Sequence, residues 1–174
     1  MVAKSLVSRL NDPSLVREQA FLAGEWAESS RAKKIAVQNP STGEILAEVT
    51  DVSIEQVRHA IVEADKAQKL WAQATGKERA LILRRWFDLV MANQRDLAII
   101  LTAEMGKPLS EAMGEVSYGA GYIEWFGEEA KRIYGDTIPA HHRDKRIVIL
   151  KQPVGVVAAI TPWNFPSAMV ARKF

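Results

Sequence analysis

The 174-residue sequence predicts an α/β fold, in which a long helical part with short β-hairpins precedes the first strand and turn of a parallel sheet. Three observations lead to this prediction. Four stretches between residues 53 and 134 repeat apolar side chains at helical spacing. Short β-branched segments separated by turn residues occupy residues 21–49. A small, apolar run at residues 154–160 suits a strand that is covered on both faces.

Composition excludes several classes of protein. Hydrophobic residues make up 48% of the sequence, as in an ordinary packed domain, and 23 Lys and Arg against 21 Asp and Glu give a net charge of +2. Such a balance argues against a dedicated nucleic-acid binder. The sequence has no cysteine, which excludes a disulfide framework and a Cys-based zinc site. No apolar run approaches the roughly 20 residues of a membrane span.

The first nine residues have two interpretations. Lys4, Arg9 and two serines without an acidic residue resemble a transit peptide faintly. The segment also fits a short amphipathic lead-in with Leu6 and Leu10 on one side, and the acidic Asp12 that follows favours this second interpretation. We therefore expect a cytoplasmic protein.

Turn chemistry predicts two hairpins before the helices. Phe21–Trp26 places a glycine turn between apolar residues. Asn39–Glu44, with Pro40 and Gly43, joins a brief strand at 35–37 to another at 45–49. Nothing in this part indicates catalysis.

Four helices are expected next. Capping boxes at Ser53–Gln56 and Thr75–Glu78 predict the first two starts, Asn93 predicts the third start, and Gly106 predicts its end. The fourth helix is expected over about Pro108–Tyr134, ended by Gly135. The stripes expected to face inward are Ile54, Val57, Ile61, Ala64 and Trp71, then Leu83, Trp86, Phe87 and Val90, then Leu97, Ile100 and Leu101, and finally Leu109, Ala112, Val116, Ala120 and Ile123.

Three further patterns on and after these helices have plain structural explanations. The helix carboxylates, Glu104 and Glu115 among them, are expected at the surface. Gly119-Ala-Gly121 lies in a helical pattern and does not follow a strand, so we reject a nucleotide-binding loop there. His141 and His142 are adjacent and have no acidic cluster nearby, so a solvated loop is expected and no metal site is predicted.

The apolar run 154–160 continues into Thr161-Pro-Trp-Asn-Phe-Pro166. Because a proline restricts the residue before it, Trp163 and Asn164 are expected in a stiff bend at the carboxyl end of a strand, where open α/β sheets bind ligands. From spacing alone, the favoured role of the Asn164 side chain is to cap the helix that Pro166 would begin. The alternative is that its NH2 group stabilises an oxygen that gains negative charge during a reaction.

Ile160–Pro166 resembles the signature of the aldehyde dehydrogenase superfamily. Further motifs resemble that superfamily at Asn39–Glu44, Glu104–Leu109, Tyr134–Pro139 and Lys151–Val156. The stretch from Ile123 to Gly135 resembles the branch that oxidises succinate semialdehyde, with glutarate-semialdehyde enzymes as near kin. The resemblance starts at about Phe21 and implies the N-terminal part of that family's fold, with an incomplete Rossmann-like cofactor domain.

The resemblance implies specific roles. Asn164 would stabilise the oxyanion that forms when a cysteine thiolate attacks the aldehyde. Thr161, Pro162, Trp163 and Asn164 would lie against the cofactor, NADP or NAD. Arg172 would bind the far carboxylate of a semialdehyde substrate, for which a planar guanidinium is suited. Without the resemblance, Arg172 is an ordinary solvated arginine.

The resemblance also divides the chain into three parts. Residues 1–143 would form the hairpins and the helical part of the cofactor domain, residues 144–152 an oligomerisation strand, and residues 153–174 the first strand, turn and helix of the dinucleotide-binding sheet. Charges flank Ile147–Leu150, as is typical of a protected edge strand. A homo-oligomer, a dimer or a tetramer, is implied for the full-length protein.

No residue of the sequence matches the family's cysteine nucleophile or its general-base glutamate. We therefore expect a truncated piece of a longer enzyme that is inactive by itself. Three hypotheses remain open. The parent oxidises succinate semialdehyde, or a close homologue such as glutarate semialdehyde, with NAD(P); the chain is a non-catalytic fragment; or it is a helical interaction module. The last is least favoured, because the helices show no apolar face without an explanation.

Overall fold

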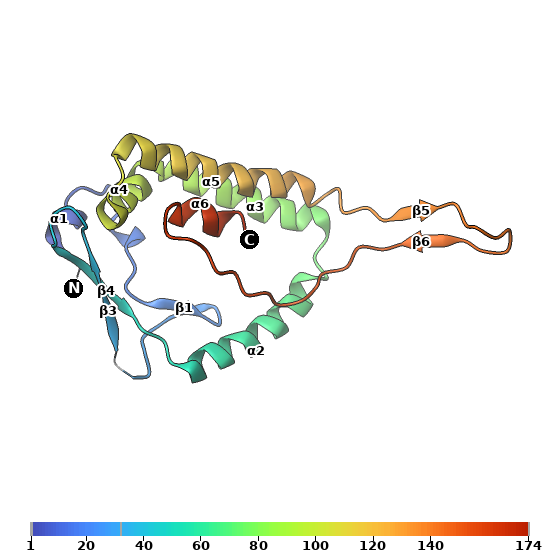
Figure 1. The fold of residues 1–174 in the computed structure, drawn as a ribbon, viewed down its shortest axis with the longest axis horizontal. Coiled ribbons are helices and arrows are strands. Elements are labelled where there is room, and N and C mark those ends of the chain that lie inside the picture. The colour runs from blue at the N-terminus through green and yellow to red at the C-terminus, as the bar shows by residue number, and fades with distance from the viewer. Residues whose placement is uncertain (1, 32, 174) are drawn as a thin grey trace.

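Most of the helices gather in one layer of the computed structural model, which describes residues 2–31 and 33–173. Figure 1 shows this layer, with a further helix, α2, running apart from it and the chain of residues 150–162 crossing between the two. The helices of the layer are α3 (Gly76–Ala92), α4 (Gln94–Met105), α5 (Leu109–Glu129) and the short α6 (Pro166–Ala171), and the helix that runs apart is α2 (Ile54–Trp71).

Three two-stranded antiparallel hairpins complete the described part of the chain. The first two confirm the predicted hairpins, and Gly43 takes the positive φ of 72° that its turn requires. The third was not predicted as a hairpin, because only its second strand had a strand pattern in the sequence. The strands are β1 (Ala20–Leu22) with β2 (Glu25–Ala27), β3 (Lys34–Gln38) with β4 (Ile45–Thr50), and β5 (Asp136–Ile138) with β6 (Ile147–Ile149).

The N-terminal segment packs into the protein as an amphipathic lead-in. It forms α1 (Lys4–Val7) and, after it, a 3-10 turn at Pro13–Leu15. Leu6 and Leu10 are buried in one cluster with Leu46 of β4 and with two residues of α4, Ile99 and Ala103. The amphipathic interpretation of this segment is confirmed. In the described residues, no helix has the length and apolar character required to cross a membrane.

The predicted helix starts are confirmed with one difference. Ser53 and Thr75 each form a complete capping box with the residue three positions later. Asn93 precedes α4 but makes no side-chain cap, and its amide nitrogen donates to the carbonyl oxygen of Leu89 at 2.9 Å. Gly106 ends α4 in the left-handed conformation, with φ at 86°.

The inward stripe of α5 is confirmed, but its predicted end is wrong. Ala112, Val116, Ala120 and Ile123 are buried, and the first two pack against α4. The helix ends at Glu129 and does not reach Tyr134. Gly135 has a different task from the predicted one: a Cβ there would lie 2.0 Å from the carbonyl oxygen of Ile149, so the chain needs a glycine where it enters the β5–β6 hairpin.

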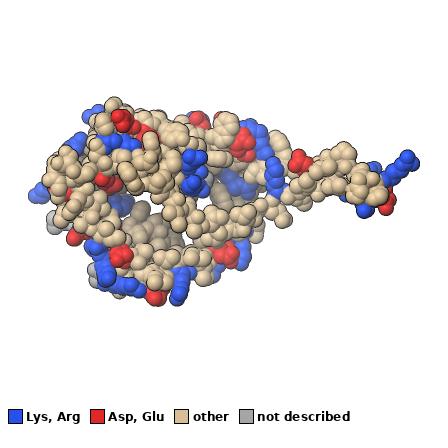
Figure 2. Space-filling view, viewed as in Figure 1, with Lys and Arg blue, Asp and Glu red and all other residues tan. Residues whose placement is uncertain are grey.

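The β5–β6 hairpin projects away from the helical layer (Figure 1). Figure 2 shows Lys and Arg side chains at its free end, where the sequence has Arg143, Lys145 and Arg146. One edge of β6 pairs with β5 of the same chain. The division into residues 1–143, 144–152 and 153–174 stays a prediction, and its outer limits, residues 1 and 174, lie outside the described residues.

The apolar stripe of α2 is not buried, against expectation. Ile54, Val57, Ile61 and Trp71 are all exposed. Leu70, Trp71 and Ile82 line an apolar hollow of about 800 Å³ with Val156. The premise that every apolar helix face has an explanation is therefore wrong for this helix, because α2 stands too far from the helical layer to bury its stripe.

Residues 154–160 do not form the predicted strand, and the chain from 150 to 162 is neither helix nor strand. A parallel strand needs neighbours to which its backbone can bond, and the sheets of the described residues are all separate hairpins. The apolar side chains are correspondingly uncovered: Val154 is 91% exposed and Ile160 is 93% exposed.

These uncovered surfaces lead to a prediction for the 174-residue chain studied alone. We expect a broad thermal transition and strong binding of a hydrophobic dye, because the α2 stripe and residues 154–160 are exposed together. Calorimetry and dye fluorescence test this. A sharp two-state transition without dye binding would contradict it.

Candidate active site

The predicted bend is present between residue 162 and α6. Residues 163–165 bend, and Pro166 occupies the first turn of α6, as expected. Thr161 is half-buried, whereas Pro162, Trp163 and Asn164 are exposed, Trp163 to 81%. In the part of the chain that the structure describes, the side-chain amide of Asn164 makes no hydrogen bond.

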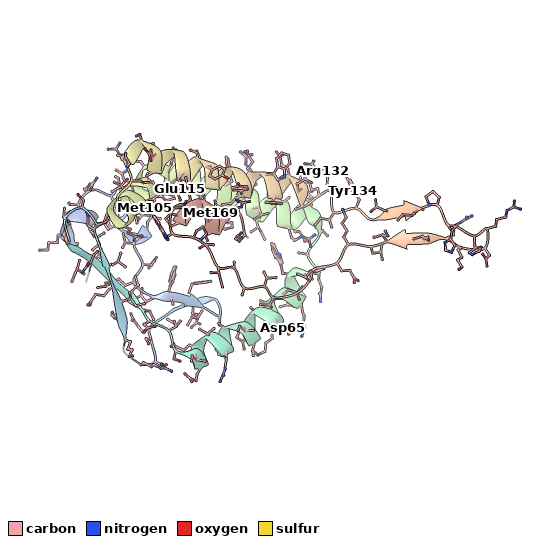
Figure 3. The ribbon with its side chains drawn as sticks, viewed as in Figure 1. Asp65, Met105, Glu115, Arg132, Tyr134 and Met169 are labelled. Carbon is pink, nitrogen blue, oxygen red and sulfur yellow. The ribbon has the colours of Figure 1, made fainter. Side chains whose placement is uncertain are left out.

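The cap of α6 comes from another helix. The residue before α6 is Phe165, which has no capping side chain. The carboxylate of Glu115, on α5, accepts hydrogen bonds from the backbone N–H groups of Ser167 at 2.9 Å and Ala168 at 3.2 Å. Figure 3 shows Glu115 next to Met169 of α6. The capping role predicted for Asn164 is therefore wrong, and so is the surface position predicted for Glu115, which is buried.

Lys107, in the loop between α4 and α5, completes this contact. Its ammonium forms an ion pair with Glu115 and donates to the backbone carbonyl oxygen of Asn164 at 3.2 Å. It also lies 4.2 Å from the ring centroid of Phe165, a cation–π distance. The buried Lys107–Glu115 pair thus brings together two motifs that are far apart in sequence, Glu104–Leu109 and Ile160–Pro166.

Sequence reasoning missed Lys107 and Glu115, although a signal for the second was present. Glu115 follows Ala112 by three residues and precedes Gly119 by four, so it lies on the buried stripe of α5. A carboxylate on an apolar stripe needs a partner, because an unpaired buried charge is costly. The identity of that partner could not be read from spacing, since Lys107 lies outside the helix.

Arg172 lies at the other end of α6, beside two tyrosines of α5. Its guanidinium carbon is 5.3 Å from the ring centroid of Tyr122. The rings of Tyr118 and Tyr122 meet edge to face at 5.0 Å, and their hydroxyl groups share a hydrogen bond. This bond with Tyr118 raises the pKa of Tyr122 above its usual value. Arg172 is thus oriented by an aromatic ring.

The same tyrosines border an apolar hollow of about 420 Å³. It is lined by Tyr118, Gly121, Tyr122, Trp125 and Phe126, all from α5. Aromatic residues within a helical pattern are ordinarily interpreted as core or helix–helix contacts, but Tyr118 and Trp125 are exposed. Helical periodicity shows which residues share a face, and it does not show whether another helix covers that face.

Gly119 sets how closely α6 can approach α5. A Cβ at this position would lie 3.2 Å from the Cα of Ala168 and 3.5 Å from the Cβ of Ala171. Ala168 itself is fully buried. Gly119 and Gly121 lie inside α5, which confirms that they form no nucleotide-binding loop.

The histidine pair shows no metal-binding arrangement. The rings of His141 and His142 lie 4.5 Å apart and tilted, in the exposed turn of the β5–β6 hairpin. Across residues 2–31 and 33–173, no three His, Cys, Asp or Glu side chains gather as metal ligands would.

Comparison with known families identifies the family to which this chain belongs. Residues 26–174 match the sequence profile described as the aldehyde dehydrogenase family. The chain belongs to the aldehyde dehydrogenase family. The predicted fold class is confirmed as well, since solved aldehyde dehydrogenases superpose on this chain over about a third of their own length.

Similar members of the aldehyde dehydrogenase family act on semialdehydes. A glutarate-semialdehyde dehydrogenase of Pseudomonas aeruginosa is 57% identical over 95% of this chain and 34% of its own length. An NADP(+) succinate-semialdehyde dehydrogenase of Escherichia coli is 54% identical over the same shares. The crystal structure of a succinate-semialdehyde dehydrogenase from Burkholderia pseudomallei has a TM-score of 0.92 at 54% identity, covering 94% of this chain and 34% of that one. The chain thus spans about a third of the curated relatives it matches.

The packing at Gly119 leads to a prediction for this aldehyde dehydrogenase chain. Gly119→Val should push α6 away and expose its first amides, lowering the local opening free energy of Ser167 and Ala168 by about 1–3 kcal/mol. Amide hydrogen exchange measures this. Gly114→Val is the matched control on the same helix, because a Cβ there meets nothing within 4 Å. Equal exchange in the two variants would contradict the packing role.

Proposed function

We propose that this chain forms the N-terminal part of an NAD(P)-dependent enzyme that oxidises an aldehyde to an acid, with a dicarboxylic semialdehyde as substrate. The observation that carries the proposal is the exposed Asn164 side chain. Glu115 caps α6, and in the described residues the Asn164 side chain makes no hydrogen bond, so its NH2 donors are available at the bend. A neutral amide donor suits an oxygen that becomes negatively charged in the transition state.

Four consecutive residues are proposed to contact the cofactor, Thr161, Pro162, Trp163 and Asn164. They fit this role because three of them are exposed and the segment belongs to no sheet or helix, so a flat ligand can lie along it. The bound nicotinamide supplies the hydride acceptor. The chain's own part is to present this surface and to hold the Asn164 amide beside it. The E. coli relative is named as NADP(+)-dependent, and either NADP or NAD is proposed here.

Arg172 is proposed to bind the substrate's second carboxylate. It lies just after α6, and Asn164 lies just before it, so the two are separated by six helical residues, about 9 Å of helix. A short dicarboxylic semialdehyde has reactive and charged ends that two such groups could bind. Succinate semialdehyde is the proposed substrate and glutarate semialdehyde the alternative, as the names of the E. coli and P. aeruginosa relatives suggest.

The chemistry also needs a nucleophile, and the sequence has no cysteine. We propose that the thiolate and the general base belong to the remaining two thirds of a longer protein. The alternative is that the chain functions without those two thirds, and it is then not catalytic because it has no thiolate nucleophile. A cytoplasmic homo-oligomer is proposed for the longer protein, with the projecting β5–β6 hairpin as a contact between subunits.

A hybrid enzyme tests the proposal directly. The chain is joined to the C-terminal two thirds of the E. coli relative, which is 54% identical over the shared part. We expect NADP reduction with succinate semialdehyde.

In this hybrid, Asn164→Asp, which replaces the amide donor by an acceptor, should lower kcat by about 10²–10³-fold. The control is Asn39→Asp, since Asn39 uses its side-chain oxygen to accept from Ser41 N and Asp retains that oxygen. Unchanged kcat in Asn164→Asp would exclude the oxyanion role.

Arg172→Leu in the same hybrid tests the choice of substrate. Loss of a charge-assisted contact should raise KM for succinate semialdehyde by about 10- to 100-fold and leave a simple aldehyde almost unaffected. Lys173→Leu, which removes the neighbouring exposed cation, should change neither value. Equal losses on both substrates would refute the carboxylate-binding role.

A further inference from the structure

We infer that Lys107 and Glu115 are positioning residues for Asn164, and that their buried ion pair holds the bend on which the proposed oxyanion donor stands. The inference rests on the proposed function, because it assigns a task to residues that act through Asn164. Neither residue reaches the surface that substrate or cofactor would use: the Lys107 side chain is 8% exposed and the Glu115 side chain 0%.

The pair contacts the chain at the backbone carbonyl of Asn164 and at the residues that follow it. Lys107 binds the backbone carbonyl oxygen of Asn164 and packs on the ring of the next residue, Phe165. Glu115 binds the N–H groups of Ser167 and Ala168 through one carboxylate oxygen and Lys107 through the other. The bend is thus fixed at its peptide and at the start of α6, through groups that come from α5 and the loop before it.

The burial of this pair sets it apart from the other salt bridges. In the described part of the chain, each of the others has both side chains at least 30% exposed. Exposed pairs contribute little to stability, whereas a buried pair costs desolvation energy that apolar residues of equal size would avoid. Stability alone therefore gives a weak reason for a buried Lys107–Glu115 pair. A more specific reason is that the pair positions the backbone carbonyl of Asn164 and the start of α6.

The bend also needs such a support. The chain before it, residues 150–162, belongs to no helix or sheet, and Trp163 is largely exposed. Two contacts therefore hold the chain near Asn164. Lys107 binds the backbone carbonyl oxygen of Asn164, and α6 packs against Gly119. A donor for a developing oxyanion acts only when it is held within roughly 0.5 Å of its working position. Loss of the pair should for this reason lower kcat more than it changes KM.

A double-mutant cycle in the hybrid enzyme separates positioning from general stability. Lys107→Met should lower kcat by about 10-fold or more when Asn164 is present. In the Asn164→Ala background, the same change should lower kcat by less than about twofold, because the group that Lys107 positions is already absent. A purely structural role would instead give the same loss in both backgrounds, and this result would overturn the inference.

Two further variants and a control complete the experiment. Lys107→Arg keeps the charge and the donors and should restore part of kcat. Glu115→Gln keeps an oxygen for Ser167 and Ala168 but removes the charge, so it should show the same non-additivity with Asn164→Ala if Lys107→Met fails to fold. Lys69→Met removes a cation from the exposed pair with Asp65 and should leave kcat unchanged.

An inactive hybrid with all of these residues intact would overturn the proposed function, and the inference with it. An active hybrid with additive losses would overturn the inference alone.

Discussion

The buried contact between Lys107 and Glu115 is the interaction on which the arrangement of the site depends. Glu115 satisfies the free N–H groups of α6, and Lys107 neutralises the carboxylate that does so. Because the ammonium also binds the carbonyl of Asn164, a single charge pair fixes both the helix and the bend before it. Two family motifs, Glu104–Leu109 and Ile160–Pro166, are thereby in direct contact.

Small side chains make this contact possible. Gly119 and Ala168 allow α6 to lie close against α5, and a short approach is required for a carboxylate on one helix to reach the backbone of the other. The same packing places Arg172 over the ring of Tyr122. The two ends of α6 therefore carry the two groups to which the family resemblance assigns the reacting and the charged ends of a semialdehyde.

The rest of the chain has a different character. The α2 stripe, the hollow beside Trp71 and residues 154–160 present apolar surface that stays exposed. The chain spans about a third of its relatives, and a lone strand of a parallel sheet has no backbone partners. Local sequence preference at 154–160 was therefore overruled by the lack of neighbours. The helical layer forms because its partners, α3, α4, α5 and α6, all lie within the chain.

The sequence by itself determined the features that arise from local chemistry. The capping boxes at Ser53 and Thr75, the left-handed Gly106, the hairpin turns and the bend at Trp163 and Asn164 depend on neighbouring residues, and the motifs around them also indicated the family. Tertiary structure alone decided the rest. It buried Glu115, which a helix-surface rule had placed in solvent, and gave α6 a cap that spacing had assigned to Asn164. It ended α5 at Glu129, placed Gly135 beside Ile149, and left the α2 stripe uncovered. Periodicity defines a face, but only the packing of other elements decides whether that face is buried, because burial depends on residues distant in sequence.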